Sequence, residues 1–147
     1  MNIILLSGGS GKRLWPLSND IRSKQFIKIF KNKNNEYESM LQRMYNGIKE
    51  LNDESNIIIA TSENQISCTK NQLGDNVDIS IEPCRRDTFP AIVLATSYLH
   101  DIKKVSKDEV VVVCPVDPYV DRKYFESLLK LYELEKKSDN NLFLMGR

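Results

Sequence analysis

The residues near the start of the chain that are best suited to chemistry are three glycines and two cations. Residues 8–13 read Gly-Gly-Ser-Gly-Lys-Arg and directly follow the apolar run at 2–7. Glycine lets a backbone turn tightly and approach a ligand, because no Cβ is in the way. Successive N–H groups in such a turn form an anion-binding concavity, and Lys12 and Arg13 add full positive charge beside it. The spacing predicts a phosphate-binding loop after a buried strand; the alternative is a glycine-rich turn with solvated cations.

The two most common phosphate motifs do not fit this stretch. A P-loop requires Gly at the position of Leu6 and Ser or Thr at the position of Arg13. The dinucleotide fingerprint can begin at Gly9, but it then places Leu14 where its third glycine packs against the helix. The loop therefore belongs to a different class of phosphate site.

Two later stretches also carry polar groups that suit a ligand. One runs Glu-Pro-Cys-Arg-Arg-Asp-Thr-Phe-Pro over residues 82–90, and the other places Asp117 just after the apolar run 109–114. For Arg86 the alternative is a surface charge paired with Asp87. For Asp117 it is a strand breaker before Pro118. Lys12 suits either a third phosphate contact or a solvent-facing position.

The hydrophobic patterns predict strands that alternate with helices. We expect strands at 2–7, 56–61, 77–81, 109–114 and 141–145. We expect one helix at 36–51 and a second that begins with a capping box at Ser62–Gln65 and ends near Gly74. A third helix should run from Asp87 or Thr88 to 104, and a fourth from a cap at Asp121 to 137. This order predicts a Rossmann-like three-layer α/β/α sandwich with a mainly parallel sheet. The carboxyl ends of parallel strands share one edge, so the glycine stretch, residues 82–90 and Asp117 should meet there.

Composition narrows the possible functions. The chain has 147 residues, enough for one domain, and 21 basic against 20 acidic residues, which argues against a nucleic-acid or membrane surface as the main partner. The three cysteines form no C-x-x-C pair, and His100 is the only histidine. This pattern argues against structural zinc and favours a reducing cytoplasm. No apolar run approaches about 20 residues, and no secretion signal is recognisable.

The motifs resemble those of the sugar-1-phosphate nucleotidyltransferases, and within them the mannose-1-phosphate guanylyltransferases. The first match is Gly-Gly-Ser-Gly-Lys-Arg-Leu-Trp-Pro-Leu-Ser at 8–18, followed by Ser-Lys-Gln-Phe at 23–26. The second comprises Glu82, Pro83, Arg86, Thr88, Pro90 and Ala91, and the third is Asp117. Four positions depart from the family pattern: Lys12 replaces Thr, Ser23 replaces Pro, Asp87 replaces Asn and Pro118 replaces His.

The resemblance implies nucleotidyl transfer from a nucleoside triphosphate, GTP by likeness, to a sugar 1-phosphate such as mannose 1-phosphate. It implies that Arg13 binds the β- and γ-phosphates, that Lys24 lies at the α-phosphate, and that Asp117 holds Mg²⁺. These three are the implied catalytic residues. The implied nucleotide-binding set is Leu6, Gly8, Gly9, Ser10, Gly11, Lys12, Arg13, Lys24, Glu82, Arg86, Thr88 and Pro90. Within it, Gly8 and Gly9 leave room for base and ribose.

The likeness covers residues 1–147 but only the N-terminal, nucleotide-binding part of the family's catalytic domain. We therefore expect a truncated chain that binds nucleotide with little transferase activity, and an apolar sheet edge that favours a homo-oligomer. A non-catalytic nucleotide-binding or regulatory module remains an alternative. A Rossmann dehydrogenase is a weaker one, because it lacks the third glycine and has only Glu36 as a ribose acid.

Overall fold

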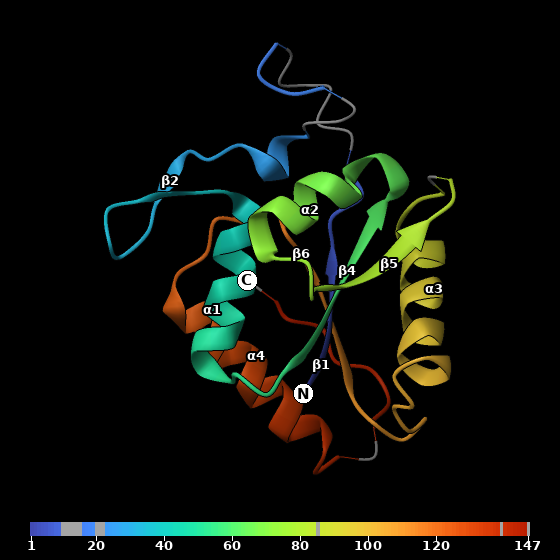
Figure 1. The fold of residues 1–147 in the computed structure, drawn as a ribbon. Coiled ribbons are helices and arrows are strands. Elements are labelled where there is room, and N and C mark those ends of the chain that lie inside the picture. The colour runs from blue at the N-terminus through green and yellow to red at the C-terminus, as the bar shows by residue number, and fades with distance from the viewer. Residues whose placement is uncertain (10–15, 20–22, 85, 139, 147) are drawn as a thin grey trace.

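The core of the molecule is a parallel sheet, seen in a computed structural model that describes residues 1–9, 16–19, 23–84, 86–138 and 140–146. Within these residues the sheet has four strands in the order β5-β4-β1-β6, and every neighbouring pair is parallel (Figure 1). The strands are β1 (Asn2–Leu6), β4 (Asn56–Ser62), β5 (Asp78–Glu82) and β6 (Val111–Pro115). The sheet order reverses between β1 and β6, because the chain adds β4 and β5 on one side of β1 before it returns to the other.

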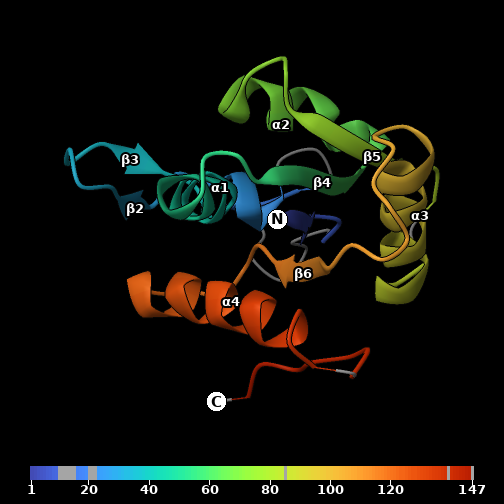
Figure 2. The same ribbon diagram turned by 90° about the horizontal axis from the view of Figure 1, so that it is seen from below.

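Helices cover both faces of the sheet, as Figure 2 shows from below. The alternating residues Ile3, Leu5, Ile57 and Ile59 pack on one face, with residues of α1 (Met40–Leu51) and α4 (Arg122–Glu135). On the other face, Ile4, Ile58 and Ala60 pack against Ala95 and Leu99 of α3 (Thr88–Asp101). The strands are apolar on both faces because both are covered. The three-layer α/β/α arrangement predicted from the sequence is present.

The helix predicted from residue 36 begins later than expected. Tyr37–Glu38 instead forms the strand β3, which pairs antiparallel with β2 (Phe30–Lys31). Ser39 then caps α1 through a capping box with Gln42, whose backbone N–H donates to Ser39 Oγ at 3.1 Å. The capping serine defines the helix start, so residues 36–38 are free to pair as a strand.

The capping box predicted at Ser62–Gln65 is wrong. Ser62 is the last residue of β4, and its side chain makes no capping bond. The chain passes through a short 3-10 turn, η3 (Glu63–Gln65), before α2 (Ile66–Leu73) begins. Gln65 is fully buried instead of reaching back to a helix terminus. The predicted end of this helix holds, because Gly74 follows it with a φ of 95°, which favours glycine.

The two later helices start where the sequence predicts. Asp87 is the N-cap of α3, although its side chain makes no capping bond. Asp121 caps α4 by accepting from the backbone N–H groups of Lys123 and Tyr124. The helix predicted to run to residue 104 ends at Asp101, and Ile102 just beyond it is exposed.

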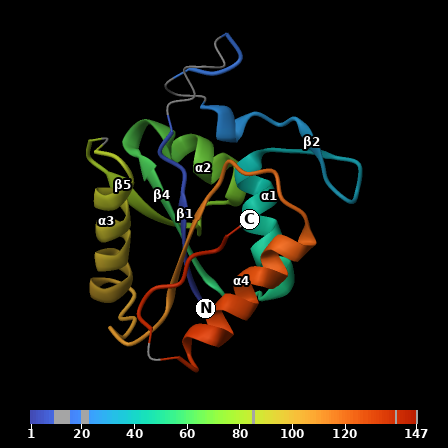
Figure 3. The same cartoon turned by 180° about the vertical axis from the view of Figure 1, so that it is seen from behind.

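The fifth predicted strand, at 141–145, is absent: residues 140–146 form no strand. Figures 2 and 3 show this red segment running outside the edge strand β6. A strand requires a hydrogen-bonded partner, and this segment pairs with none of the described strands. Its apolar side chains remain in contact with solvent, with Leu142 76% and Leu144 83% exposed.

Candidate functional site

The predicted ligand groups lie along one rim of the sheet, at the carboxyl ends of its strands. Gly8 and Gly9 follow β1, Glu82 is the last residue of β5, and Asp117 follows β6. The reversal of strand order between β1 and β6 places the glycines and Asp117 at a topological switch point, where open α/β sheets bind ligands. Ser10, Gly11, Lys12 and Arg13 lie outside the described residues.

A cavity of about 350 Å³ opens at the β1 and β5 part of this rim. It is lined by Leu6, Gly8, Gly9, Glu82, Asp87, Thr88 and Ala91. Five of these residues belong to the implied nucleotide-binding set. Arg86 and Pro90 are exposed and do not line the cavity; Arg86 Nε instead lies 3.4 Å from Cys84 Sγ.

Gly8 is held close to the carboxylate of Glu82. A Cβ built on Gly8 would lie 2.8 Å from Glu82 Oε1, nearer than side chains normally approach. Glu82 is buried, and its carboxyl group lies in the wall of the cavity next to the glycine backbone. The missing side chain at residue 8 is therefore what leaves space between the two strand ends.

Lys24 and Asp117 form an ion pair at the other part of the rim. Lys24 belongs to the short 3-10 turn η2 (Lys24–Phe26), and its Nζ lies 2.7 Å from Asp117 Oδ2. The two side chains are 34% and 47% exposed, so water screens the pair and its effect on stability is small. Both side chains stay accessible, so a phosphate could replace Asp117 at Lys24 and a metal ion could replace Lys24 at Asp117.

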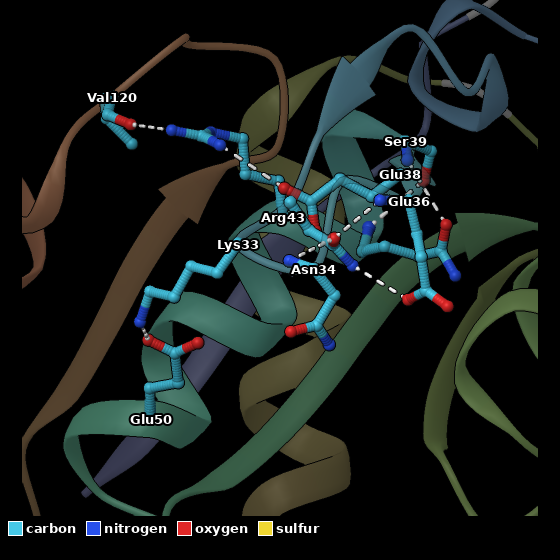
Figure 4. Close-up of polar contacts among 10 residues, drawn as sticks. Lys33, Asn34, Glu36, Glu38, Ser39, Arg43, Glu50 and Val120 are labelled. Carbon is cyan, nitrogen blue, oxygen red and sulfur yellow. Dashed lines mark hydrogen bonds and ion pairs between the residues drawn. The ribbon is translucent and has the colours of Figure 1, made fainter.

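Arg43 holds the segment that carries Asp117 (Figure 4). Its Nη2 donates to the Val120 carbonyl at 3.0 Å, and its Nη1 lies 3.3 Å from Glu38 Oε1. The guanidinium also lies over the Tyr119 ring, 4.7 Å from its centroid. One side chain of α1 thereby ties the hairpin strand β3 to the chain after β6. No motif pointed to Arg43, because its partners come from distant parts of the sequence.

A buried cluster of side-chain amides contacts the chain on both sides of the glycine stretch. Gln25 Nε2 donates to the Ser7 carbonyl at 2.6 Å and to the Gly9 carbonyl at 3.3 Å. Gln65 Nε2 donates to the same Gly9 carbonyl at 3.3 Å and to Ser23 Oγ at 2.6 Å. Gln25 belongs to the Ser-Lys-Gln-Phe motif, whereas sequence reasoning assigned Gln65 only to a capping box.

The described residues form no enclosed metal site. They contain no group of three or more His, Cys, Asp and Glu side chains that could enclose a metal ion. Mg²⁺ is commonly held by one or two carboxylates together with substrate phosphates, so Asp117 alone fits a metal ion that binds with a nucleotide. Among the helices of the described part of the chain, none is long and apolar enough to cross a membrane.

Known sequences resemble this chain over most of its length. A sequence model of the family described as nucleotidyl transferase matches residues 2–146. A mannose-1-phosphate guanylyltransferase from Escherichia coli is 33% identical over 124 residues, which cover 81% of this chain and 25% of the relative. One from Salmonella montevideo is 32% identical over 117 residues, or 78% and 23%. The chain thus spans about a quarter of the length of these curated relatives.

A solved structure shares the fold. It is described as a mannose-1-phosphate geranyltransferase from Thermus thermophilus, and it is 26% identical to this chain with a TM-score of 0.72. The match covers 90% of this chain and 37% of that one. The Rossmann-like fold of nucleotide-sugar transferases, predicted from the order of strands and helices, is confirmed.

Proposed function

The chain belongs to the nucleotidyl transferase family, and from this we propose that its sheet rim binds a nucleoside triphosphate for transfer to a sugar 1-phosphate. By likeness to the guanylyltransferases we propose GTP and mannose 1-phosphate as the substrates. The observation that carries the proposal is the meeting of Gly8, Gly9, Glu82 and Thr88 around one cavity at the switch-point rim. Residues 1–147 would form the nucleotide-binding part of the catalytic domain.

The cavity suits the base and ribose end of the nucleotide. It combines glycine backbone, one carboxylate and the start of α3 at Thr88. Glu82 can accept hydrogen bonds from base or ribose donors, and Thr88 can both donate and accept. Leu6 and Ala91 supply apolar contacts for the ring. Arg13 is proposed on its motif position alone, as the partner of the β- and γ-phosphates.

Lys24 and Asp117 would exchange partners when the triphosphate binds. Lys24 Nζ would leave Asp117 and lie against an α-phosphate oxygen, where its charge favours the transition state. Asp117 would then be free to hold Mg²⁺, whose role is to neutralise charge on the phosphoryl oxygens. A sugar 1-phosphate oxygen would attack the α-phosphorus. The bond from the α-phosphorus to the oxygen that bridges to the β-phosphate would break, and pyrophosphate would leave.

The proposed compartment is the cytoplasm. Cys68, Cys84 and Cys114 are all free thiols in the structure. Free thiols persist where the environment is reducing, which agrees with a cytoplasmic protein that uses nucleotide substrates.

A titration with four nucleotides tests the proposal directly. GTP, ATP, CTP and dTTP are added to the protein with and without Mg²⁺, and binding is followed by calorimetry. We expect GTP to bind best, and Mg²⁺ to strengthen its binding through Asp117. The matched variant Asp117→Asn keeps the side-chain shape and should lose most of the Mg²⁺ effect. Equal weak binding of all four nucleotides, with no effect of Mg²⁺, would contradict the proposal.

A further inference from the structure

One buried side chain contacts both flanks of the glycine stretch. Gln65 Nε2 donates to the Gly9 carbonyl on the β1 side and to Ser23 Oγ on the η2 side. Gly9 belongs to the glycine stretch at 8–13, and Ser23 directly precedes the turn η2, which carries Lys24. Gln65 itself comes from η3, at the end of β4, so it links the stretch to a third part of the rim.

The orientation of the Gln65 amide is fixed at both of its ends. Its Oε1 accepts from Thr61 Oγ1 at 2.9 Å and from Gln25 Nε2 at 3.4 Å, while its Nε2 makes the two donations to the flanks. Gln65, Thr61 and Ser23 are completely inaccessible to solvent. Water therefore cannot replace the bonds among these three residues, and a rotated or missing amide would deprive the buried hydroxyls of Thr61 and Ser23 of this partner.

We propose that Gln65 is a positioning residue for the nucleotide site. It does not contact the nucleotide; it holds the Gly9 carbonyl and Ser23 at set places, and with them the glycine backbone that faces Glu82 and the turn that carries Lys24. The inference rests on the proposed function for its effect on binding. Its structural part, the anchoring of both flanks, stands on the hydrogen bonds alone.

A matched pair of glutamine variants tests this role. Gln65→Met keeps the side-chain volume and removes the amide. Gln42→Met makes the same change in α1, at a partly buried glutamine that closes the capping box with Ser39 and donates from Nε2 to the Gln72 carbonyl at 3.1 Å. Both variants lose side-chain hydrogen bonds, but those of Gln42 reach neither Gly9 nor η2, so the control separates general destabilisation from loss of the anchor.

Three measurements are made on each full-length variant: the urea midpoint, the Kd for GTP with Mg²⁺, and hydrogen exchange at the Ser7 amide, which donates to the Ala60 carbonyl. We expect Gln65→Met to weaken GTP binding by about tenfold or more, because small displacements of binding groups are costly. Gln42→Met should stay within about twofold of the parent even where its urea midpoint falls equally. Equal effects of the two variants on Kd, or an unchanged Kd in Gln65→Met, would overturn the proposal.

Two provisions keep the result decisive. If Gln65→Met does not fold, Thr61→Val replaces it, since this change keeps the shape and removes the hydroxyl that orients Gln65 Oε1. Unaltered GTP affinity in Thr61→Val then overturns the proposal. If the parent protein binds no nucleotide, the proposed function fails, and hydrogen exchange decides the anchoring. Faster exchange at Ser7 in Gln65→Met than in Gln42→Met supports the anchoring, and equal exchange refutes it.

Discussion

Lys24 and Asp117 lie 93 positions apart in the sequence, and their charged atoms meet at the rim of the sheet. The pair is partly exposed, so each side chain is held by a partner that an incoming phosphate or metal ion can replace. Gly8 matters for a different reason: it has no Cβ, and a Cβ at this position would lie too close to Glu82. These two features lead to predictions about single residues.

The first prediction concerns the ammonium group at the rim. Lys24→Ala should lower the small turnover of GTP and mannose 1-phosphate expected of this chain by on the order of a hundredfold, since a charge that acts mainly in the transition state is lost. The fold should persist, because the Lys24–Asp117 pair is half-exposed and contributes little to stability. Lys28→Ala, at an exposed lysine nearby, is the matched control. A Lys24→Ala rate close to that of the control would refute the assignment.

The second prediction compares two neighbouring glycines. Gly8→Ala forces the Glu82 carboxylate to move and should lower the free energy of unfolding by about 1 kcal/mol, as mild overpacking does. Gly9→Ala has room, because the nearest atom to its added Cβ is Gln25 Oε1 at 4.0 Å. Urea denaturation of both variants measures the difference. Equal midpoints would show that Glu82 does not confine residue 8.

At the scale of elements, β6 and α4 pack through a buried thiol. Cys114 of β6 is buried in the core beside Tyr124 and Phe125 of α4. Burial raises the pKa of the Cys114 thiol from 9.0 to about 11, and a hydrogen bond with Tyr124 acts weakly in the opposite direction. Burial and the neighbouring Cys114 also raise the pKa of Tyr124. The contact between strand and helix therefore depends on both groups staying protonated.

The third prediction follows from that dependence. A raised pKa in the folded state means that the unfolded chain loses the Cys114 proton first, so stability is complete below about pH 9 and falls between pH 9 and 11. Between pH 8 and 10.5 the thiol should account for about 2 kcal/mol of the lost unfolding free energy. Cys114→Ala should therefore show a smaller decrease over the same interval in urea denaturation. An identical decrease in parent and variant would exclude this contribution.

The elements that could be predicted are those that depend on local apolar runs. Residues 2–6, 56–62 and 111–115 form strands within two residues of the predicted limits, because each is a short apolar run and the first two are buried on both faces. The meeting of the candidate ligand groups at one rim could also be predicted, because parallel strands have their carboxyl ends at the same edge of the sheet. The start of α1 was missed because the predicted helix was extended back to residue 36, past Ser39, whose local capping box with Gln42 defines the start. Of the buried amide cluster, Gln25 lay in a recognised motif, but Gln65 was assigned only to a capping box, because its side-chain partners Gln25 and Ser23 lie about 40 positions away in the sequence.

At the scale of the whole molecule, β6 is one edge of the sheet and apolar side chains lie outside it. Val113 is partly exposed on this strand, and Leu142 and Leu144 are highly exposed in the segment that runs past it. An open strand edge next to exposed leucines is a surface on which further chain can pair. The fifth strand predicted at 141–145 lies in this region but stays unpaired.

The fourth prediction is that the isolated 147-residue chain self-associates through this edge. Light scattering coupled to size-exclusion chromatography should show a mass that rises with concentration. The double variant Leu142→Glu with Leu144→Glu places charges on the edge and should shift the protein toward the monomer. The control Ile102→Glu changes another exposed apolar residue, beyond the end of α3, and should leave the mass unchanged. A clean parent monomer at all concentrations would contradict the prediction.

The position of β1 between β4 and β6 also affects how the protein emerges from the ribosome. Asn2 pairs with Asn56 on one side and with Val111 on the other. At typical synthesis rates the last partner is made roughly 5 to 20 s after the first strand. During that interval Ile3, Ile4 and Leu5, which are fully hidden in the finished protein, stay open to water on the nascent chain. The first strand of this sequence is thus among the last to be enclosed, which makes its apolar residues a natural binding site for chaperones.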